Sequence, residues 1–226
     1  MSSRSEQSHV ARRGFVARLS AAAAGLTAFV GLPDRLRAAA TTTQSPSNQN
    51  DPDAWIDRLT GKDRLLLHVH KDLLPGLVAA RNVLGHGREF YGVPERDSSV
   101  VVATHGPAIG GMFKDVMWQQ FTLGERYKLK DPTTGAPYTR NPFLTPQEGS
   151  PPDAVVPGLM QRGVMFLVCN IAIRNLSRRI VRAGESPEPL HKELAAGLLP
   201  GIVVVPDLFV AISHAQKKGV GYLFID

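Results

Sequence analysis

The stretch GVMFLVCNIAIRNLSRRIVRA, residues 163–183, decides the fold of this chain. The segment 163–170 is short and almost entirely apolar, which indicates a strand that is covered on both faces. In residues 171–183, apolar side chains such as Ile173 and Leu176 recur at helical spacing, with arginines between them. The stretch therefore predicts a buried strand that leads directly into an amphipathic helix.

The same pattern continues on both sides of this stretch. Short apolar runs predict further strands over residues 64–70, 98–106, 201–206 and 221–226. Apolar residues at helical spacing predict helices over residues 73–91, 108–121, 191–198 and 208–218. Strands that alternate with helices form right-handed crossovers, which place a mostly parallel sheet between helical layers. We therefore expect one α/β domain over residues 55–226, with three layers (α/β/α) and a mainly parallel five-stranded sheet.

The composition excludes several classes of protein. With 226 residues, 43% hydrophobic and 20% charged, the chain is neither disordered, collagen-like nor a disulfide scaffold. Its single cysteine excludes an internal disulfide and a cysteine-cluster metal site. The formal charge of +6 belongs mostly to residues 1–40, and the rest of the chain has no basic stripe with interleaved aromatic residues. We therefore expect no nucleic-acid partner.

Residues 1–40 have the layout of an export signal. A basic start is followed by the mildly apolar stretch LSAAAAGLTAFVGL and then by small residues suited to a signal peptidase. The residues that carry this pattern are Arg12, Arg13, Phe15, Ala38 and Ala40. The arginine pair resembles a twin-arginine signal, so we expect export by that machinery, cleavage after residue 40 and a periplasmic protein without a stable membrane anchor. An amphipathic helix with an incidental arginine pair is the alternative.

Two further segments lack a regular pattern. Residues 41–54 are polar and contain proline, which is typical of a flexible leader. Residues 128–157 hold seven of the 17 prolines and form an unusually long insertion. A lid, an oligomer contact and a solvated loop are all compatible with this composition.

The predicted topology places several polar residues at one edge of the sheet. In open parallel sheets, ligands bind beyond the carboxyl ends of the strands. Those ends carry His70, His105, Cys169 with Asn170, and Pro206. We expect His70, Asn170 and Pro206 to contribute to a ligand-binding site there.

Cys169 is the sharpest chemical feature of the sequence. It lies where a strand ends and a helix begins, and helix amide groups with the helix dipole favour a thiolate at that position. A thiolate can attack an electrophile, carry a persulfide or be oxidised. Alternatively, Cys169 packs as a small hydrophobic residue.

His105 is the second candidate for a catalytic role. It is followed by Gly106 and Pro107, which suit a tight turn and the start of a helix. Its imidazole is a candidate general base, thiolate partner or ligand-orienting donor, and the alternative is a hydrogen bond to its own loop.

His68 and His70 lie two residues apart on a predicted strand, so both face the same side. With His105 they form an alternative metal site, although the spacing is weak evidence. The turn after the first strand matches no phosphate-binding loop, and no Gly-x-Ser-x-Gly motif is present. Our main prediction is therefore a protein with no metal and no cofactor.

Four segments together resemble the DsrE/DsrF-like superfamily of sulfur-relay proteins, and more closely its exported branch. They are VVVATHGPAI (100–109), KDVMWQQFTLGE (114–125), GVMFLVCNIAIR (163–174) and LLPGIVVVPDLFVAISHAQKKGVGY (198–222). The resemblance covers most of residues 55–226 and implies a three-layer α/β/α fold and homo-oligomers. In sulfur-transfer members a cysteine at the matching strand end carries a persulfide, and Cys169 occupies that position. The export signal and the proline-rich insertion depart from the cytoplasmic relay members.

These observations favour a periplasmic sulfur-handling protein in which Cys169 carries sulfane sulfur and His105 assists its deprotonation. A sulfur donor or acceptor protein is then a possible partner. Two alternatives remain open: a non-catalytic module that binds a small molecule or a metal, and an oligomeric scaffold.

Overall fold

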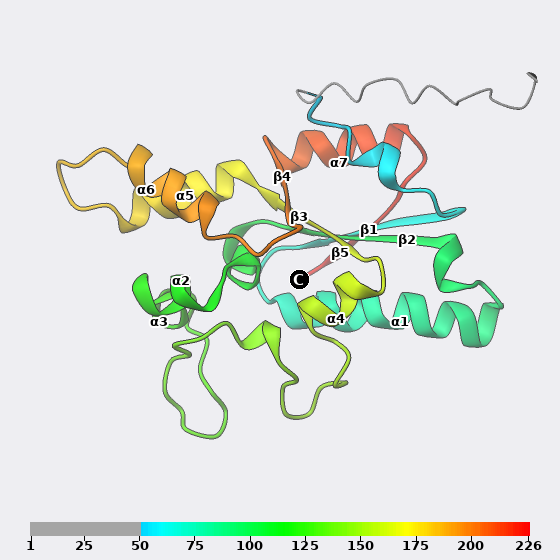
Figure 1. The fold of residues 1–226 in the computed structure, drawn as a ribbon, viewed down its shortest axis with the longest axis horizontal. Helices are drawn as coiled ribbons and strands as arrows, with labels where there is room; N and C mark the ends of the chain where they lie inside the picture. The colour runs from blue at the N-terminus through cyan, green and yellow to red at the C-terminus, as the bar shows by residue number, and fades with distance from the viewer. Residues whose placement is uncertain (1–50) are drawn as a thin grey trace, which may run out of the picture. The chain divides into compact units, whose positions relative to one another are not determined.

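The computed structural model describes residues 51–226. Within them the chain forms one five-stranded sheet in the order β4-β3-β2-β1-β5, and every neighbouring pair is parallel. The strands are β1 (Asp63–Val69), β2 (Ser98–Thr104), β3 (Met165–Cys169), β4 (Val203–Val205) and β5 (Gly221–Ile225). Helices lie on both faces of this sheet, so the predicted α/β fold with three layers is confirmed (Figure 1).

The register of the sheet aligns the carboxyl ends of the central strands. Val69 at the end of β1 pairs with Thr104 at the end of β2, and Thr104 pairs with Val168 in β3. Cys169 in turn pairs with Val205 at the end of β4. The residues that follow these strands therefore emerge along one edge of the sheet.

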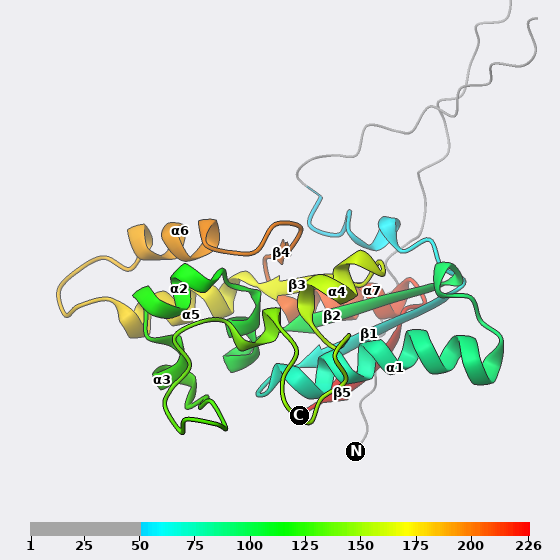
Figure 2. The same ribbon diagram turned by 60° about the horizontal axis from the view of Figure 1, so that its bottom comes forward.

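The helices differ in which face of the sheet they cover. They are α1 (Leu73–Tyr91), α2 (Asp115–Gln120), α3 (Leu123–Tyr127), α4 (Val156–Gln161), α5 (Asn170–Ile180), α6 (Glu188–Ala196) and α7 (Leu208–Lys217). Helices α1 and α4 lie on one face and α7 on the other (Figures 1 and 2). Strands β1 to β4 follow one another across the sheet, whereas the chain returns through α7 to place β5 beside β1. The direction of the chain across the sheet therefore reverses after β4, and such reversals form ligand sites in α/β proteins.

The core lies around the three central strands. The side chains of Leu67, Val101 and Leu167 are fully buried, in agreement with the continuous apolar pattern of their strands. Edge strand β5 is different, because Tyr222, Leu223 and Phe224 remain 40%, 48% and 47% exposed. The apolar run of β5 predicted its strand conformation, but it did not predict that this strand lies at an open edge.

The predicted helix over residues 108–121 is wrong in its extent. Residues Gly106–Met112 form a 3₁₀ helix, the chain then extends through Phe113, and α2 follows. Gly111 packs closely against Leu73, and a Cβ atom there would collide with the buried Leu73 side chain. Phe113 pairs with Leu198 in an antiparallel bridge. These tertiary contacts override the helical spacing of the apolar residues.

The proline-rich insertion packs against the domain in its second half. The buried side chain of Asn141 donates to the carbonyl oxygens of Gly111 (3.0 Å) and Phe113 (2.6 Å) and accepts from the amide of Phe143 (3.0 Å). Phe143 is 4% exposed. Helix α4 begins at Val156, inside the segment predicted as a loop. The insertion is therefore anchored at Asn141, with exposed residues on both sides of that anchor.

The predicted signal peptide, with Arg12, Arg13, Phe15, Ala38 and Ala40, lies outside the described residues. Of the predicted leader, residues 51–54 are described and form turns. Asp53 contacts His214 in α7, with 2.6 Å between Oδ2 and Nδ1. Among the described residues, no helix combines the length and apolar character needed to cross a membrane.

Candidate functional site

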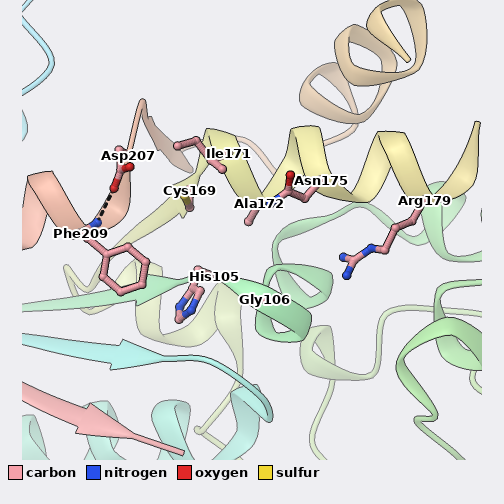
Figure 3. Close-up of a pocket in the computed structure, with 9 residues that line it drawn as sticks. All are labelled: His105, Gly106, Cys169, Ile171, Ala172, Asn175, Arg179, Asp207 and Phe209. Carbon is pink, nitrogen blue, oxygen red and sulfur yellow. Dashed lines mark hydrogen bonds between the residues drawn. The ribbon is translucent and has the colours of Figure 1, made fainter. Parts of the chain in front are cut away.

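A small cavity opens at the carboxyl edge of the sheet, where β2, β3 and β4 end (Figure 3). Its volume is about 190 Å³. Residues from the ends of three strands and from α5 line it: His105, Gly106, Cys169, Ile171, Ala172, Asn175, Arg179, Asp207 and Phe209. The cavity therefore brings together Cys169 and His105, the two residues for which the sequence predicted a catalytic role.

Cys169 joins β3 to α5. It is the last residue of the strand and the N-cap of the helix, with extended backbone torsions (φ −74°, ψ 119°). Its side chain makes no capping hydrogen bond to the helix amides. The residue is only 5% exposed, yet it lines the cavity. A small molecule in the cavity can therefore meet this sulfur, whereas a bulky reagent cannot easily reach it.

His105 joins β2 to the 3₁₀ helix that follows. Gly106 has a left-handed backbone (φ 61°), and a side chain there would collide with the imidazole of His70. Glycine is thus required at this turn, both for the backbone conformation and for the close approach of His70. Figure 3 shows the His105 imidazole on the same side of the cavity as Phe209.

Three histidines form a connected cluster behind the cavity. His68 is 3% exposed; its Nε2 lies 2.7 Å from Nδ1 of His105, and its Nδ1 lies 3.0 Å from the hydroxyl of Tyr222. The ring of His70 stacks on that of His105, with 4.4 Å between centroids and 8° between planes. His68 and His70 thus both contact the ring of His105.

The cluster favours uncharged imidazoles. Burial, followed by the charges of His105 and His70, lowers the pKa of His68 to about 4. Burial and the charge of His70 also hold the pKa of His105 below its usual value. At neutral pH both rings are therefore uncharged, and each has one nitrogen that can accept a proton.

The cluster lacks the geometry of a metal centre. Two imidazole ligands of a tetrahedral zinc ion, each about 2.0–2.1 Å from the metal, have nitrogens more than about 3 Å apart. The 2.7 Å between the facing nitrogens of His68 and His105 is a direct hydrogen bond instead. Within residues 51–226, no group of three or more His, Cys, Asp or Glu side chains is arranged to hold a metal ion.

The remaining predicted site residues lie beside the cavity and do not line it. His70 lies behind His105 and Gly106, which line the cavity, and its Nδ1 lies 4.0 Å from Asp226. Asn170 turns toward α6, where its Oδ1 accepts a hydrogen bond from Nε2 of His191 at 2.8 Å. Pro206 is exposed, and its neighbour Asp207 lines the cavity in its place.

Sequence reasoning missed part of the cavity wall. Arg179 is one of the arginines between the apolar residues of the predicted amphipathic helix, and in the structure it lines the cavity together with Asn175 (Figure 3). Asp207 caps α7 by accepting from the amides of Phe209 (2.8 Å) and Val210 (3.3 Å). The four-residue spacing from Asn175 to Arg179 places both on one helix face. The sequence contains no signal that this face, rather than another polar face, meets the cavity.

Comparison with known proteins identifies no family for this chain. No family model matches the chain, and no curated protein matches it. Among solved structures, the protein of unknown function MTH1491 from Methanobacterium thermoautotrophicum is similar, with 15% sequence identity and a TM-score of 0.38. The match covers 72% of this chain and 99% of that protein.

Proposed function

We propose that this protein is a sulfur carrier of the DsrE/DsrF-like type, in which Cys169 accepts sulfane sulfur from a small donor. One observation carries the proposal: the Cys169 sulfur and the His105 imidazole line the same small cavity at the ligand-binding edge of a parallel sheet. The resemblance of four sequence segments to that superfamily supports the same function.

The proposed reaction is a single sulfur transfer. The Cys169 thiol loses its proton to His105, and the thiolate attacks the outer sulfur of thiosulfate. The new S–S bond forms as the S–S bond of thiosulfate breaks, and sulfite leaves with the bonding electron pair. Cys169 then carries a persulfide. No other oxidant or reductant is consumed.

His105 suits the role of proton acceptor in this step. Its uncharged imidazole lies in the same cavity as the thiol, and Arg179 supplies a positive charge to the cavity wall. That charge favours both a thiolate and an anionic sulfur donor. The cavity of about 190 Å³ suits a donor the size of thiosulfate.

The test is the intact mass of the purified full chain after incubation with thiosulfate or polysulfide. We expect an adduct with the mass of one sulfur atom that is reversed by a thiol reductant. Cys169→Ser removes it, whereas Asn175→Ala, a change in the same cavity wall, keeps it. If neither donor forms an adduct on the wild-type chain, the proposal fails and a binding module without chemistry is favoured.

We further propose that the protein acts in the periplasm after twin-arginine export and that it assembles as a homo-oligomer. The arginine pair of residues 12 and 13 supports the first proposal. The exposed aromatic residues of β5 support the second.

A further inference from the structure

A second cavity of about 270 Å³ lies on the other side of Arg179 from the Cys169 cavity. Its lining residues are Pro107, Arg126, Tyr127, Leu176 and Arg179. Arg179 is common to both cavities, and Gly106 and Pro107, which line one cavity each, are adjacent in the chain. The two cavities are therefore neighbours that share a positively charged wall.

The hydroxyl of Tyr127 is buried and has no hydrogen-bond partner among residues 51–226. The side chain is partly buried, and its ring packs against Gly110, where a Cβ atom would come within 2.8 Å of Cε2. Burial raises the pKa of Tyr127, while the charges of Arg179 and Arg126 oppose that rise. The hydroxyl therefore remains protonated and is a donor without an acceptor, which is uncommon in folded proteins.

The two arginines of this cavity also have unused donors. Nε of Arg126 donates to the carbonyl oxygen of Phe121 at 2.8 Å, which leaves its terminal nitrogens available. Neither Arg126 nor Arg179 forms an ion pair with a carboxylate among residues 51–226. Two guanidinium groups and one buried hydroxyl donor thus converge on a cavity with no acidic residue in its wall.

We propose that this second cavity binds a small divalent sulfur oxyanion, held by the guanidinium groups of Arg126 and Arg179 and by a hydrogen bond from the Tyr127 hydroxyl. Guanidinium groups bind such anions through charge-assisted hydrogen bonds, and the Tyr127 hydroxyl gains the acceptor that it lacks. An oxygen of the anion is that acceptor.

The link to sulfur chemistry rests on the proposed function. In the proposed transfer, both the donor thiosulfate and the released sulfite are divalent or nearly divalent oxyanions of this size. Arg179 lies in the wall of both cavities, so an anion held in the second cavity is next to the cavity of Cys169. The second cavity therefore gives the carrier a preference for anionic donors over uncharged ones.

Calorimetric titration of the full chain with thiosulfate tests this site, in a Cys169→Ala background that prevents sulfur transfer. Tyr127→Phe keeps the ring on Gly110 and removes only the hydroxyl, so we expect the dissociation constant to rise at least about tenfold. Arg126→Gln has a similar effect. The matched control Arg174→Gln, on an exposed residue of α5 outside both cavities, stays within about twofold of the parent.

A purely structural role of Tyr127 predicts a different result. Removing a buried, unpartnered hydroxyl then leaves thiosulfate binding unchanged while the melting temperature stays equal or rises. That outcome overturns the proposal, as does phosphate binding that is tighter than binding of thiosulfate and sulfite. Intact binding in the Cys169→Ala chain, together with no persulfide on the wild type, refutes sulfur transfer and leaves the oxyanion site standing.

Discussion

At the scale of single residues, the hydrogen bonds of His68 decide how His105 is held. When Nδ1 of His105 donates to Nε2 of His68 (2.7 Å), Nδ1 of His68 donates to the hydroxyl oxygen of Tyr222 (3.0 Å). This arrangement leaves Nε2 of His105 unprotonated. His68 is thus a positioning residue, which fixes the tautomer of the proposed proton acceptor without lining the Cys169 cavity itself.

We predict that His68→Gln slows the alkylation of Cys169 by iodoacetamide at neutral pH by roughly tenfold. Glutamine keeps much of the side-chain volume, but its amide both donates and accepts, so it does not fix which nitrogen of His105 carries the proton. Intact mass gives the rate of alkylation at each of a series of pH values. We expect the pH profile of the variant to lose the contribution of the histidine cluster. His86→Gln, an exposed histidine of α1, serves as the matched control and leaves the rate unchanged. Equal rates for the two variants contradict a positioning role of His68.

The lowered pKa values of His68 and His105 also predict how stability depends on pH. In the unfolded chain these imidazoles bind protons below about pH 6.5, whereas folded His68 does so only near pH 4. Since the unfolded state takes up more protons in this window, the free energy of unfolding falls as the pH is lowered through it. We expect the melting temperature to drop by several degrees from pH 7 to pH 5. His68→Phe reduces this drop, and a drop of the same size in that variant argues against the assignment.

At the scale of elements, the sequence predicted the regular parts of the domain and missed those decided by tertiary contact. The predicted helix over residues 73–91 matches α1 at both ends, because Asp72 caps its start and Gly92 closes it in a left-handed conformation. Both signals are local and can be read from the sequence. Local signals did not predict the conformation of the segment after β2, because its 3₁₀ helix depends on close packing of Gly111 against Leu73.

The candidate site was predictable to a similar extent. Cys169 and His105 follow strands, and strand ends can be located from apolar runs, so their meeting at one edge was foreseeable. Arg179 and Tyr127 lie on helices, where their inclusion in a cavity depends on how α5 and α3 sit in the fold. No local pattern in the sequence encodes that placement.

Asn141 allows a direct test of how the insertion is anchored. We expect Asn141→Ala to lower the free energy of unfolding by about 1–3 kcal/mol, because the buried carbonyls of Gly111 and Phe113 lose their donor. Urea denaturation measures this change. Thr133→Ala, in the exposed part of the same insertion, is the control and should have little effect. An equal, small effect of both substitutions contradicts the view that the insertion is anchored at Asn141.

At the scale of the whole domain, an aromatic surface surrounds His68. Phe209, Tyr222 and Phe224 all contact its ring, with centroids 5.8, 6.0 and 5.2 Å away, and all three are at least 40% exposed. They lie beside the open edge of β5. Clustered exposed aromatic residues next to the outer edge of a sheet are typical of an association surface.

We therefore predict that the chain self-associates through this aromatic surface. Phe224→Glu is expected to lower the mass measured by light scattering toward that of the single chain, because a carboxylate is costly to bury in an apolar contact. Phe90→Glu, a substitution of a 68% exposed residue on α1, leaves the mass unchanged. A wild-type chain with the mass of a monomer at high concentration refutes the prediction.

The most direct test of sulfur transfer follows one atom. Thiosulfate isotopically labelled in its outer sulfur is incubated with the full chain, and the peptide that contains Cys169 is then analysed by mass spectrometry. The account predicts that the labelled sulfur is bound to Cys169 and that an equal amount of unlabelled sulfite is released. An unmodified Cys169 peptide, or label found elsewhere in the chain, contradicts it.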